Sequence, residues 1–327
     1  MKQTRIILVL TLALAFMAGC KGSDENKVLP SIGGKPGEVA VVCSKAMWEG
    51  EPGSALRALL SDEVPYLPQV EPMYDLFNVP PQVFNKVFRV HRNIIVLDVD
   101  KKHTDNLLVK FSDVWATPQV VINISADSQA KITELINNNG AQILDILEQK
   151  ERSRILSNAQ SYENAELDNT IREIFGGSPM LPTGFTIKKK TDDFIWVSYE
   201  TTYTNQSILI WKYPAQGEDA LSPEALAAKR NEITKEHIPC TMENSYMILN
   251  PDIFPGDRQI TVDGRKVTEL RGLWEAYNDF MGGPFVSHSF LNPDGSEVIT
   301  LDAFVYAPKY DKRNYLRQVE GLLYSFK

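Results

Sequence analysis

The chain has 327 residues, of which 43% are hydrophobic and 23% are charged, and its formal net charge is −8. This length and composition are enough to bury a sizeable core in one large domain or two ordinary ones, which excludes a globally disordered chain. The acidic balance argues against a nucleic-acid partner and against electrostatic adhesion to anionic lipid headgroups.

Residues 1–19 have the pattern of a bacterial lipoprotein signal peptide. Lys2 and Arg5 precede a nearly continuous apolar run from Ile6 to Ala18. That run is too short for a membrane-spanning helix, which needs about 20 residues, so we expect cleavage directly before Cys20. The Cys20 thiol would then carry a diacylglyceryl group, and acyl chains such as palmitate would anchor the protein, because two or three chains bind a membrane lastingly. The alternative is an unlipidated secreted protein in which Cys20 occurs by chance.

Residues 20–37 form a predicted flexible tether, because they are mostly Lys, Gly, Ser, Pro and acidic residues. The run from Lys21 to Glu25 has two interpretations. Acidic residues directly after an acylated cysteine resemble the surface-export signals of Bacteroidetes lipoproteins, whereas the simpler interpretation is a tether that faces the periplasm. The sequence therefore predicts a lipid-anchored protein of the cell envelope, in the outer membrane, and leaves its face undecided.

Residues 38–177 are predicted to form an N-terminal α+β lobe. Apolar, β-branched segments separated by polar and proline breaks predict strands of an antiparallel sheet, while the proline-rich segment 66–81 is expected to be irregular or at a sheet edge. Apolar residues recur at helical spacing over 127–175, which predicts a helical hairpin or a long helix pair, broken near 137–140 or near 158–164. The expected strands are 38–44, 87–98, 107–111 and 119–125, and a further helix is expected at 54–60.

Residues 178–327 are predicted to form a C-terminal α+β lobe, and the run Gly176–Pro179 marks the boundary between the lobes. Ser222 can cap a helix that begins at Pro223, and an amphipathic pattern predicts a final helix from about Asp311. The predicted fold class is α+β, with mainly antiparallel sheets covered by helices, in two lobes or one large domain. The expected strands are 185–189, 194–199, 207–211, 246–249, 259–262, 266–273, 285–290 and 297–306.

The sequence has no Gly-x-Ser-x-Gly nucleophile elbow and no phosphate-binding loop, so it assigns no catalytic residue. His237 and Cys240 lie three residues apart but lack a second pair of ligands, and we predict no metal site and no cofactor. His288 is expected to be a packed strand residue rather than a catalytic base. Paired carboxylates are the remaining enzymatic option, with candidates Glu269, Glu275 and Asp279.

Five aromatic residues are candidates for a binding surface. If exposed, they could stack on the faces of sugars; if buried, they belong to the core, which is the favoured interpretation because aromatic side chains dominate core energetics. These residues are Trp196, Trp211, Trp274, Tyr277 and Phe280.

Two cysteines remain besides Cys20. An envelope compartment permits a Cys43–Cys240 disulfide, but two separate buried thiols are the favoured interpretation, since free cysteines are commonly small buried residues. The spacing of the two cysteines alone does not decide between these possibilities.

Two stretches of the C-terminal lobe resemble an uncharacterised lipoprotein family of Bacteroidetes bacteria, known as a domain of unknown function. The first runs from Leu273 to Ser287 and includes Met-Gly-Gly-Pro-Phe, and the second runs from Phe304 to Leu316. The resemblance extends over most of the mature chain. It implies an envelope lipoprotein and supplies no activity, ligand or catalytic residue.

The anchor and the missing catalytic motifs together predict a non-enzymatic binding or scaffolding lipoprotein. Its expected partners are the membrane, through the lipid on Cys20, and an envelope protein or glycan. The alternative hypothesis is a hydrolase that acts on a glycan or cell-wall polymer through paired carboxylates. A concave site with two facing acids would favour this alternative.

Overall fold

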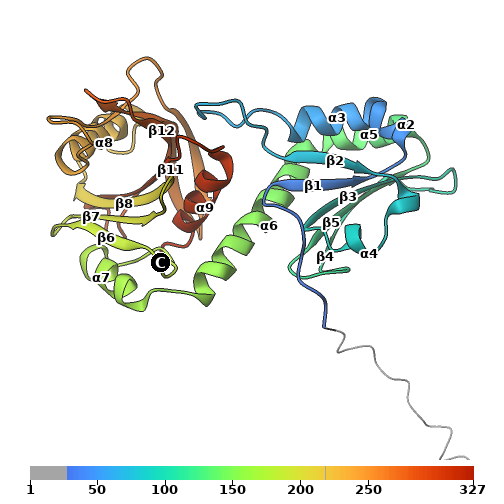
Figure 1. Cartoon of the computed structure of the whole chain (residues 1–327), viewed down its shortest axis with the longest axis horizontal. Helices are drawn as coiled ribbons and strands as arrows, with labels where there is room; N and C mark the ends of the chain where they lie inside the picture. Colours follow the sequence, from blue (N-terminus) through green and yellow to red (C-terminus); the bar gives the residue numbers. More distant parts are fainter. Residues whose placement is uncertain (1–27, 218) are drawn as a thin grey trace, which may run out of the picture.

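The computed structural model describes residues 28–217 and 219–327, so the predicted signal peptide and Cys20 lie outside the described residues. The fold is α+β, as the sequence predicts, with two β-sheets that each carry helices (Figure 1). The elements of the first half are β1 (Glu38–Val42), α2 (Lys45–Glu49), α3 (Glu51–Leu60), β2 (Asp75–Val79), the 3-10 helix η1 (Pro81–Val83), α4 (Lys86–Arg89), β3 (Asn93–Val99), β4 (Leu107–Ser112), β5 (Val120–Ala126), α5 (Gln129–Asn138) and α6 (Gly140–Ser161). Those of the second half are α7 (Ala165–Phe175), β6 (Thr186–Lys190), β7 (Phe194–Glu200), β8 (Asn205–Pro214), α8 (Pro223–His237), β9 (Tyr246–Leu249), β10 (Gly256–Val262), β11 (Arg265–Tyr277), β12 (Gly282–Leu291), β13 (Glu297–Tyr306) and α9 (Arg313–Leu323).

The first sheet has the strand order β2-β1-β3-β5-β4. Four of these strands are parallel to one another, and only β4 at the edge runs antiparallel, which corrects the antiparallel arrangement expected for this region. The reason is visible in the burial of β1, β3 and β5, which are apolar and buried on both faces. Such uninterrupted apolar runs are typical of parallel strands, whereas a half-exposed antiparallel strand alternates polar and apolar residues.

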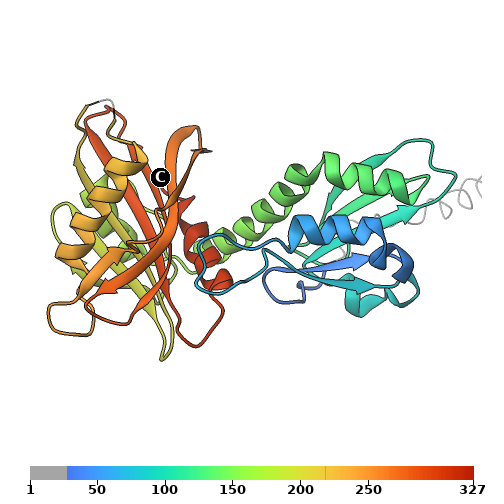
Figure 2. The same cartoon turned by 90° about the horizontal axis from the view of Figure 1, so that it is seen from above.

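The helical region after β5 contains three helices, α5, α6 and α7, instead of the expected pair. The chain breaks at both predicted places, because α5 ends before Asn139 and α6 ends before Tyr162. Helices α3, α5 and α6 cover one face of the first sheet and share its main hydrophobic cluster, and a smaller cluster with Phe84 and Phe88 covers the other face. Helix α6 then runs on from the first sheet to the second (Figure 2). Within the described residues, no helix has the length and hydropathy needed to cross a membrane.

The second sheet is antiparallel throughout and curled, with the strand order β10-β11-β12-β13-β8-β7-β6, and β9 also pairs with β11 (Figure 2). Side chains on one face pack with α7 and α9, and those on the other face pack with α8. The predicted cap of α8 is confirmed: the Ser222 hydroxyl accepts a hydrogen bond from the Ala225 backbone amide, and Pro223 is the first helical residue. Successive side chains of a strand point to opposite faces of the sheet, so the second sheet separates two apolar layers, one against α7 and α9 and one against α8.

Cys43 and Cys240 are both free thiols, so the structure has no bridge between them. The physical reason is their location. Cys43 belongs to the main cluster of the first sheet, whereas Cys240 packs against the cluster beneath α8 on the second sheet. Burial raises the pKa of each thiol to about 11, which makes both poor nucleophiles at neutral pH.

Candidate functional site

A loop of residues 61–74 extends from the first sheet to the second and meets the start of α9 (Figure 1). Its Glu71 carboxylate is buried and accepts hydrogen bonds from the backbone amides of Lys312 (2.6 Å) and Arg313 (2.9 Å). The first amides of a helix lack partners and carry partial positive charge, so a carboxylate at this position stabilises the helix end. The loop therefore fixes the N-terminus of α9 to the first half of the chain.

A second connection joins α9 to α6. Arg317 donates a hydrogen bond to the Glu148 carboxylate (2.8 Å) and another to the Met73 carbonyl (3.1 Å), while the Tyr74 hydroxyl also donates to Glu148 (2.8 Å). Gly256 on β10 allows the loop to approach closely, since a Cβ atom there would lie 2.5 Å from the Tyr66 hydroxyl. These contacts hold the two halves of the molecule against each other.

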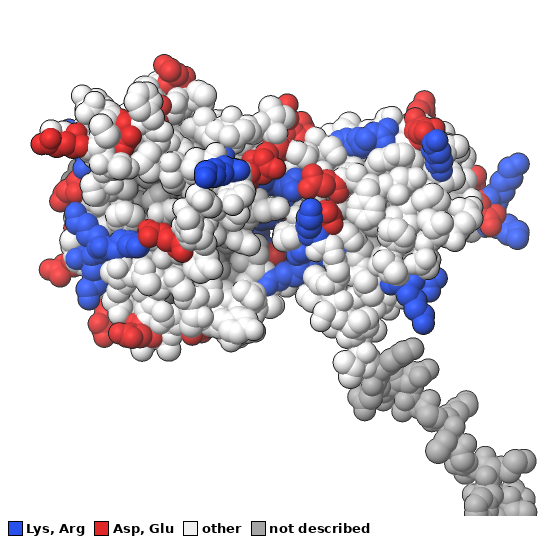
Figure 3. Space-filling model, viewed as in Figure 1, with Lys and Arg blue, Asp and Glu red and all other residues white. Residues whose placement is uncertain are grey.

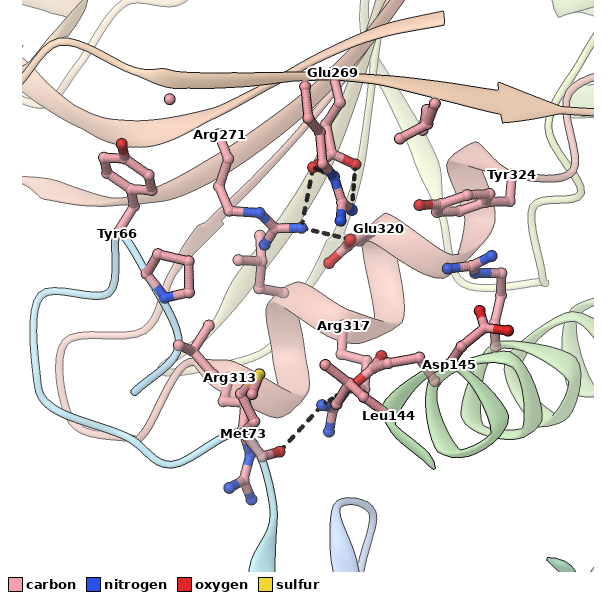
Figure 4. Close-up of a pocket in the computed structure, with 18 of the residues that line it drawn as sticks. Tyr66, Met73, Leu144, Asp145, Glu269, Arg271, Arg313, Arg317, Glu320 and Tyr324 are labelled. Carbon is pink, nitrogen blue, oxygen red and sulfur yellow. Dashed lines mark hydrogen bonds and ion pairs between the residues drawn. The ribbon is translucent and has the colours of Figure 1, made fainter. Parts of the chain in front are cut away.

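A cavity of about 650 Å³ lies between the loop, α6, α9 and strands β10 and β11 (Figure 4). This volume is within the range of about 300–1,000 Å³ that is typical of small-molecule sites. Charges of both signs gather where the two halves meet (Figure 3), and the cavity wall itself holds five arginines and five acidic residues. The arginines are Arg152, Arg258, Arg271, Arg313 and Arg317, and the acids are Asp145, Glu148, Asp257, Glu269 and Glu320.

Glu269 on β11 is at the centre of the charged wall, as Figure 4 shows. Its carboxylate accepts two hydrogen bonds from Arg258 (2.7 and 2.9 Å) and lies 3.3 Å from His288 Nε2 and 3.7 Å from Arg271. Arg271 in turn donates to Glu320 on α9. Burial by itself raises the pKa of Glu269, but the hydrogen bonds from His288 and Arg258 and the nearby arginines outweigh it and lower the pKa to about 2.

Arg152 on α6 differs from the other four arginines of the cavity. Arg258, Arg271, Arg313 and Arg317 are each ion-paired with a carboxylate. The Arg152 guanidinium instead lies over the Tyr324 ring, 3.4 Å from its centroid, and no carboxylate of the described residues is within ion-pair distance of it. Burial raises the pKa of Tyr324 to about 12, so this residue stays a neutral hydroxyl beside the cation. Arg152 is therefore the cation of this wall whose donors remain available to a ligand.

The protonation of Glu269 predicts how stability depends on pH. A carboxyl group with a pKa of about 2 in the folded state, against 4.5 ordinarily, stabilises the fold above pH 4.5, and this contribution is lost as the pH falls toward 2. Glu269→Gln should remove on the order of 2–3 kcal/mol of this pH-dependent stability. Urea unfolding of both proteins between pH 6 and pH 3 measures the difference; parallel curves for the two proteins would contradict the assignment.

The five aromatic residues singled out in the sequence do not form one site. Trp211 and Trp274 are each 2% exposed and belong to the core beneath α8. Trp196 is half-buried, Tyr277 is 53% exposed and stacks on Tyr246, and Phe280 is fully exposed. The core interpretation holds for two of the five, and the other three lie on the outer surface of the second half.

The candidate carboxylates are also separate. Glu269 and Glu275 lie six residues apart on one strand, a distance of about 20 Å, which is too long for the two acids of a glycosidase. Glu275 accepts a hydrogen bond from Asn250 (2.8 Å), and Asp279 accepts hydrogen bonds from the backbone amides of Thr241 and Met242. Across residues 28–217 and 219–327, no group of three or more His, Cys, Asp or Glu residues could hold a metal ion.

The arginines of the cavity were missed in the sequence, although α9 carries a signal for them. Arg313, Arg317, Glu320 and Tyr324 recur at spacings of three and four residues, which places them on one face of a helix. That charged face lies beside the apolar stripe of Leu316, Val319 and Leu323, which are buried, and the two stripes share an edge. A charged stripe of this length beside an apolar one indicates a polar junction within the protein.

Comparisons with known proteins find uncharacterised domains in both halves of the chain. Residues 164–325 match a family model described as a domain of unknown function (DUF4837), and residues 32–160 match a second one (DUF8532). This agrees with the resemblance to an uncharacterised family seen in the sequence. The two matches meet between α6 and α7, and the lobe boundary expected after Gly177 stays a prediction.

No curated protein matches the chain. Among solved structures, a mutant of the protein Mog1 has a TM-score of 0.29 at 10% identity, covering 46% of this chain and 89% of that one. Human STARD10 has a TM-score of 0.22 at 10% identity, covering 49% of this chain and 80% of that one. At these TM-scores, neither likeness carries an argument.

Proposed function

We propose that this protein is a lipid-anchored cell-envelope protein that binds a small anionic ligand in the cavity between its two sheets and does not transform it. The single observation that carries the binding role is Arg152, a half-buried guanidinium at the cavity wall that lacks a carboxylate partner among the described residues. Its four neighbours are each paired with a carboxylate. Asp145 and Asp257 of the same wall have no arginine partner among the described residues, so an anion would be held by direct contact with Arg152 and not by a net positive charge of the wall.

The surroundings of Arg152 favour a ligand with a carboxylate or phosphate group. A guanidinium presents donors in a planar fork that matches both groups, and a hydrogen bond between charged partners is worth more than a neutral one. Met73, Leu144 and Ile260 supply apolar wall to the same cavity.

The hydrolase alternative has less support from the geometry. A glycosidase needs one carboxylic acid that is protonated at working pH and a second that is ionised. Glu148, Glu269 and Glu320 are each held by an arginine, and Glu269 has its pKa lowered to about 2. With this lowered pKa, Glu269 keeps its negative charge at neutral pH and cannot donate a proton to a leaving group.

The envelope location is proposed from the sequence, because the lipidated Cys20 lies outside the described residues. The tether would place the folded part near the outer membrane, on either its periplasmic or its outer face. If Cys20→Ala protein still fractionates with membranes in its processed form, acylation is not the anchor. Protease treatment of intact cells decides the face, since a protected protein would rule out surface export.

Muramyl dipeptide is a suitable probe for the cavity, because it combines one amino sugar with a short peptide that bears a carboxylate. We expect the full-length lipoprotein, purified in detergent, to bind this probe, and Arg152→Gln to weaken binding about tenfold, as loss of one charge-assisted hydrogen bond predicts. Isothermal titration measures the affinity.

The matched control is Arg172→Gln, which removes the same charge from α7, outside the cavity, where Arg172 pairs with Asp168. N,N′-Diacetylchitobiose, a neutral disaccharide, tests whether the anionic group is required. Equal affinities of the wild type and Arg152→Gln for muramyl dipeptide would contradict the proposed site.

A further inference from the structure

A second hollow, of about 330 Å³, lies on the outer surface of the second half, where β6 and β7 meet the C-terminal end of α8. We name it the lysine groove and define it by six residues of its wall: Lys189, Trp196, Lys235, His237, Asn244 and Tyr246. None of these residues lines the cavity between the sheets. An inference about the groove therefore goes beyond the proposed function and does not rest on it.

The backbone explains why these residues lie together. Lys189 and Trp196 are register partners in the antiparallel pair β6–β7, so their side chains lie side by side on the face that α8 covers. A register shift between Ile187 and Lys189 bulges β6 at this point. Lys235 and His237 belong to the last turn of α8, where the helix dipole favours positive charge.

The groove has an excess of positive charge. Lys188 at its rim is paired with Glu200 (2.8 Å), and the exposed Glu236 carboxylate lies 3.7 Å from His237 Nε2. Lys189 donates only to the Glu236 backbone carbonyl (3.2 Å), and the Lys235 ammonium lies over the Tyr246 ring at 5.2 Å. For Lys189 and Lys235, the described part of the chain offers no carboxylate within ion-pair distance. Two ammonium groups thus face the groove without a neutralising partner.

His237 forms part of the inner wall of the lysine groove. Its side chain is 8% exposed, and its ring stacks on Phe194 with 4.1 Å between the ring centroids. Its Nδ1 atom is buried and has no hydrogen-bond partner in the part of the chain that the structure describes. Because Nδ1 has almost no accessible surface, a ligand in the groove cannot contact it; His237 shapes the wall, and the positive charge of the groove comes from Lys189 and Lys235.

Aromatic side chains complete the groove. Trp196 and Tyr246 line it, Tyr246 stacks on Tyr277 with 5.0 Å between the ring centroids, and the turn that carries the exposed Phe280 lies beyond Tyr277. Of the three predicted binding aromatics outside the core, Trp196 lines the groove, and Tyr277 and Phe280 lie outside its wall. The carbon–hydrogen face of a pyranose ring is apolar and packs on such rings, while Asn244 can hydrogen-bond to hydroxyl groups.

We propose that the lysine groove binds an acidic sugar unit of a glycan, with the sugar face on Trp196 and its anionic group at Lys189 and Lys235. An anionic membrane surface could also meet lysines and an exposed phenylalanine. The location of the groove disfavours it, because α8 lies at the end of the molecule away from β1, where the anchored tether enters the fold (Figure 1).

Trigalacturonic acid tests this proposal on the full-length lipoprotein in detergent. We expect it to bind, its neutral methyl ester to bind about fivefold or more weakly, and Lys235→Gln and Lys189→Gln each to weaken binding about fivefold. The matched control is Lys229→Gln, the same change on the same helix outside the groove, which should leave the affinity unchanged. Both positions on α8 are at the surface, so the variants should fold.

Four outcomes would overturn the proposal. These are no binding of trigalacturonic acid at low-millimolar concentration, equal affinity for the methyl ester, equal weakening by Lys229→Gln and Lys235→Gln, and binding to phosphatidylglycerol vesicles in its place. Arg152→Gln should leave trigalacturonate binding intact, which keeps this result separate from that for the inter-sheet cavity.

Discussion

Replacing Glu151 by alanine is expected to lower the free energy of unfolding by about 3–5 kcal/mol. Glu151 on α6 is 2% exposed, and its carboxylate accepts hydrogen bonds from Arg92 (3.0 and 2.8 Å), Arg154 (3.0 Å) and Asn93 (2.8 Å). Without it, two buried guanidinium groups would face each other with no counter-charge. Burial already lowers the pKa of Arg154 to about 10, which shows how poorly this place solvates a cation.

The Glu151 network also has a structural role, since it fixes α6 to the first sheet just before the helix crosses to the second. Arg154 donates further hydrogen bonds to the carbonyls of Pro118 (2.8 Å) and Arg92 (2.7 Å) at the ends of β5 and β3. Asp145→Ala is the control, because it removes an exposed carboxylate from the same helix. This carboxylate accepts a hydrogen bond from Gln149. Urea unfolding at pH 7 should show a change of less than about 1 kcal/mol for Asp145→Ala; equal losses for the two variants would contradict the network.

The second large effect is expected at Asp302 on β13. Its carboxylate is fully buried and accepts two hydrogen bonds from Arg230 of α8 (2.8 and 3.2 Å), whose guanidinium also lies 3.8 Å from the centroid of the Phe285 ring. Asp302→Ala should cost about 3–5 kcal/mol, because the arginine is left buried and unpaired. Urea unfolding at pH 7 measures this loss.

The double variant Arg230→Met with Asp302→Leu serves as the matched comparison for this buried pair. Replacement of both charges by apolar side chains of similar size removes the unpaired charge, so most of the lost stability should return. If the double variant is as unstable as Asp302→Ala alone, the cost arises from packing and not from the unpaired charge. The ion pair would then stabilise the contact between α8 and the sheet through its volume and not through its charges.

Local signals in the sequence were sufficient for most elements of the second half. Ser222 and Pro223 mark the start of α8 because capping depends on neighbouring residues alone, and the apolar stripe with Leu316 and Val319 marks α9 for the same reason. Four of the five strands of the first sheet were located, but their direction was wrong, the expected strand 87–98 begins within α4, and β2 was expected only as irregular or edge structure. Direction depends on how the connections cross the sheet, and an apolar run such as Val120–Ala126 fits either orientation until its burial on both faces is known.

The candidate site was beyond local signals. Arg152, Arg258 and Arg317 come from α6, β10 and α9, and they converge only because α6 spans both sheets and the loop with Glu71 holds α9 in place. The aromatic candidates show the converse. The sequence favoured the core for all five, and this holds for Trp211 and Trp274; which of the five are buried depends on where α8 packs, which strand alternation does not reveal.

The central claim is that the cavity binds an anionic ligand without transforming it. The most direct measurement is mass spectrometry of muramyl dipeptide after incubation with the purified full-length lipoprotein, with the protein-bound and free fractions recovered separately. We expect more of the probe in the bound fraction of the wild-type protein than in the bound fraction of Arg152→Gln. The probe should be chemically intact in both the bound and the free fractions. Cleavage products that form with the wild type and disappear with Glu269→Gln would contradict it.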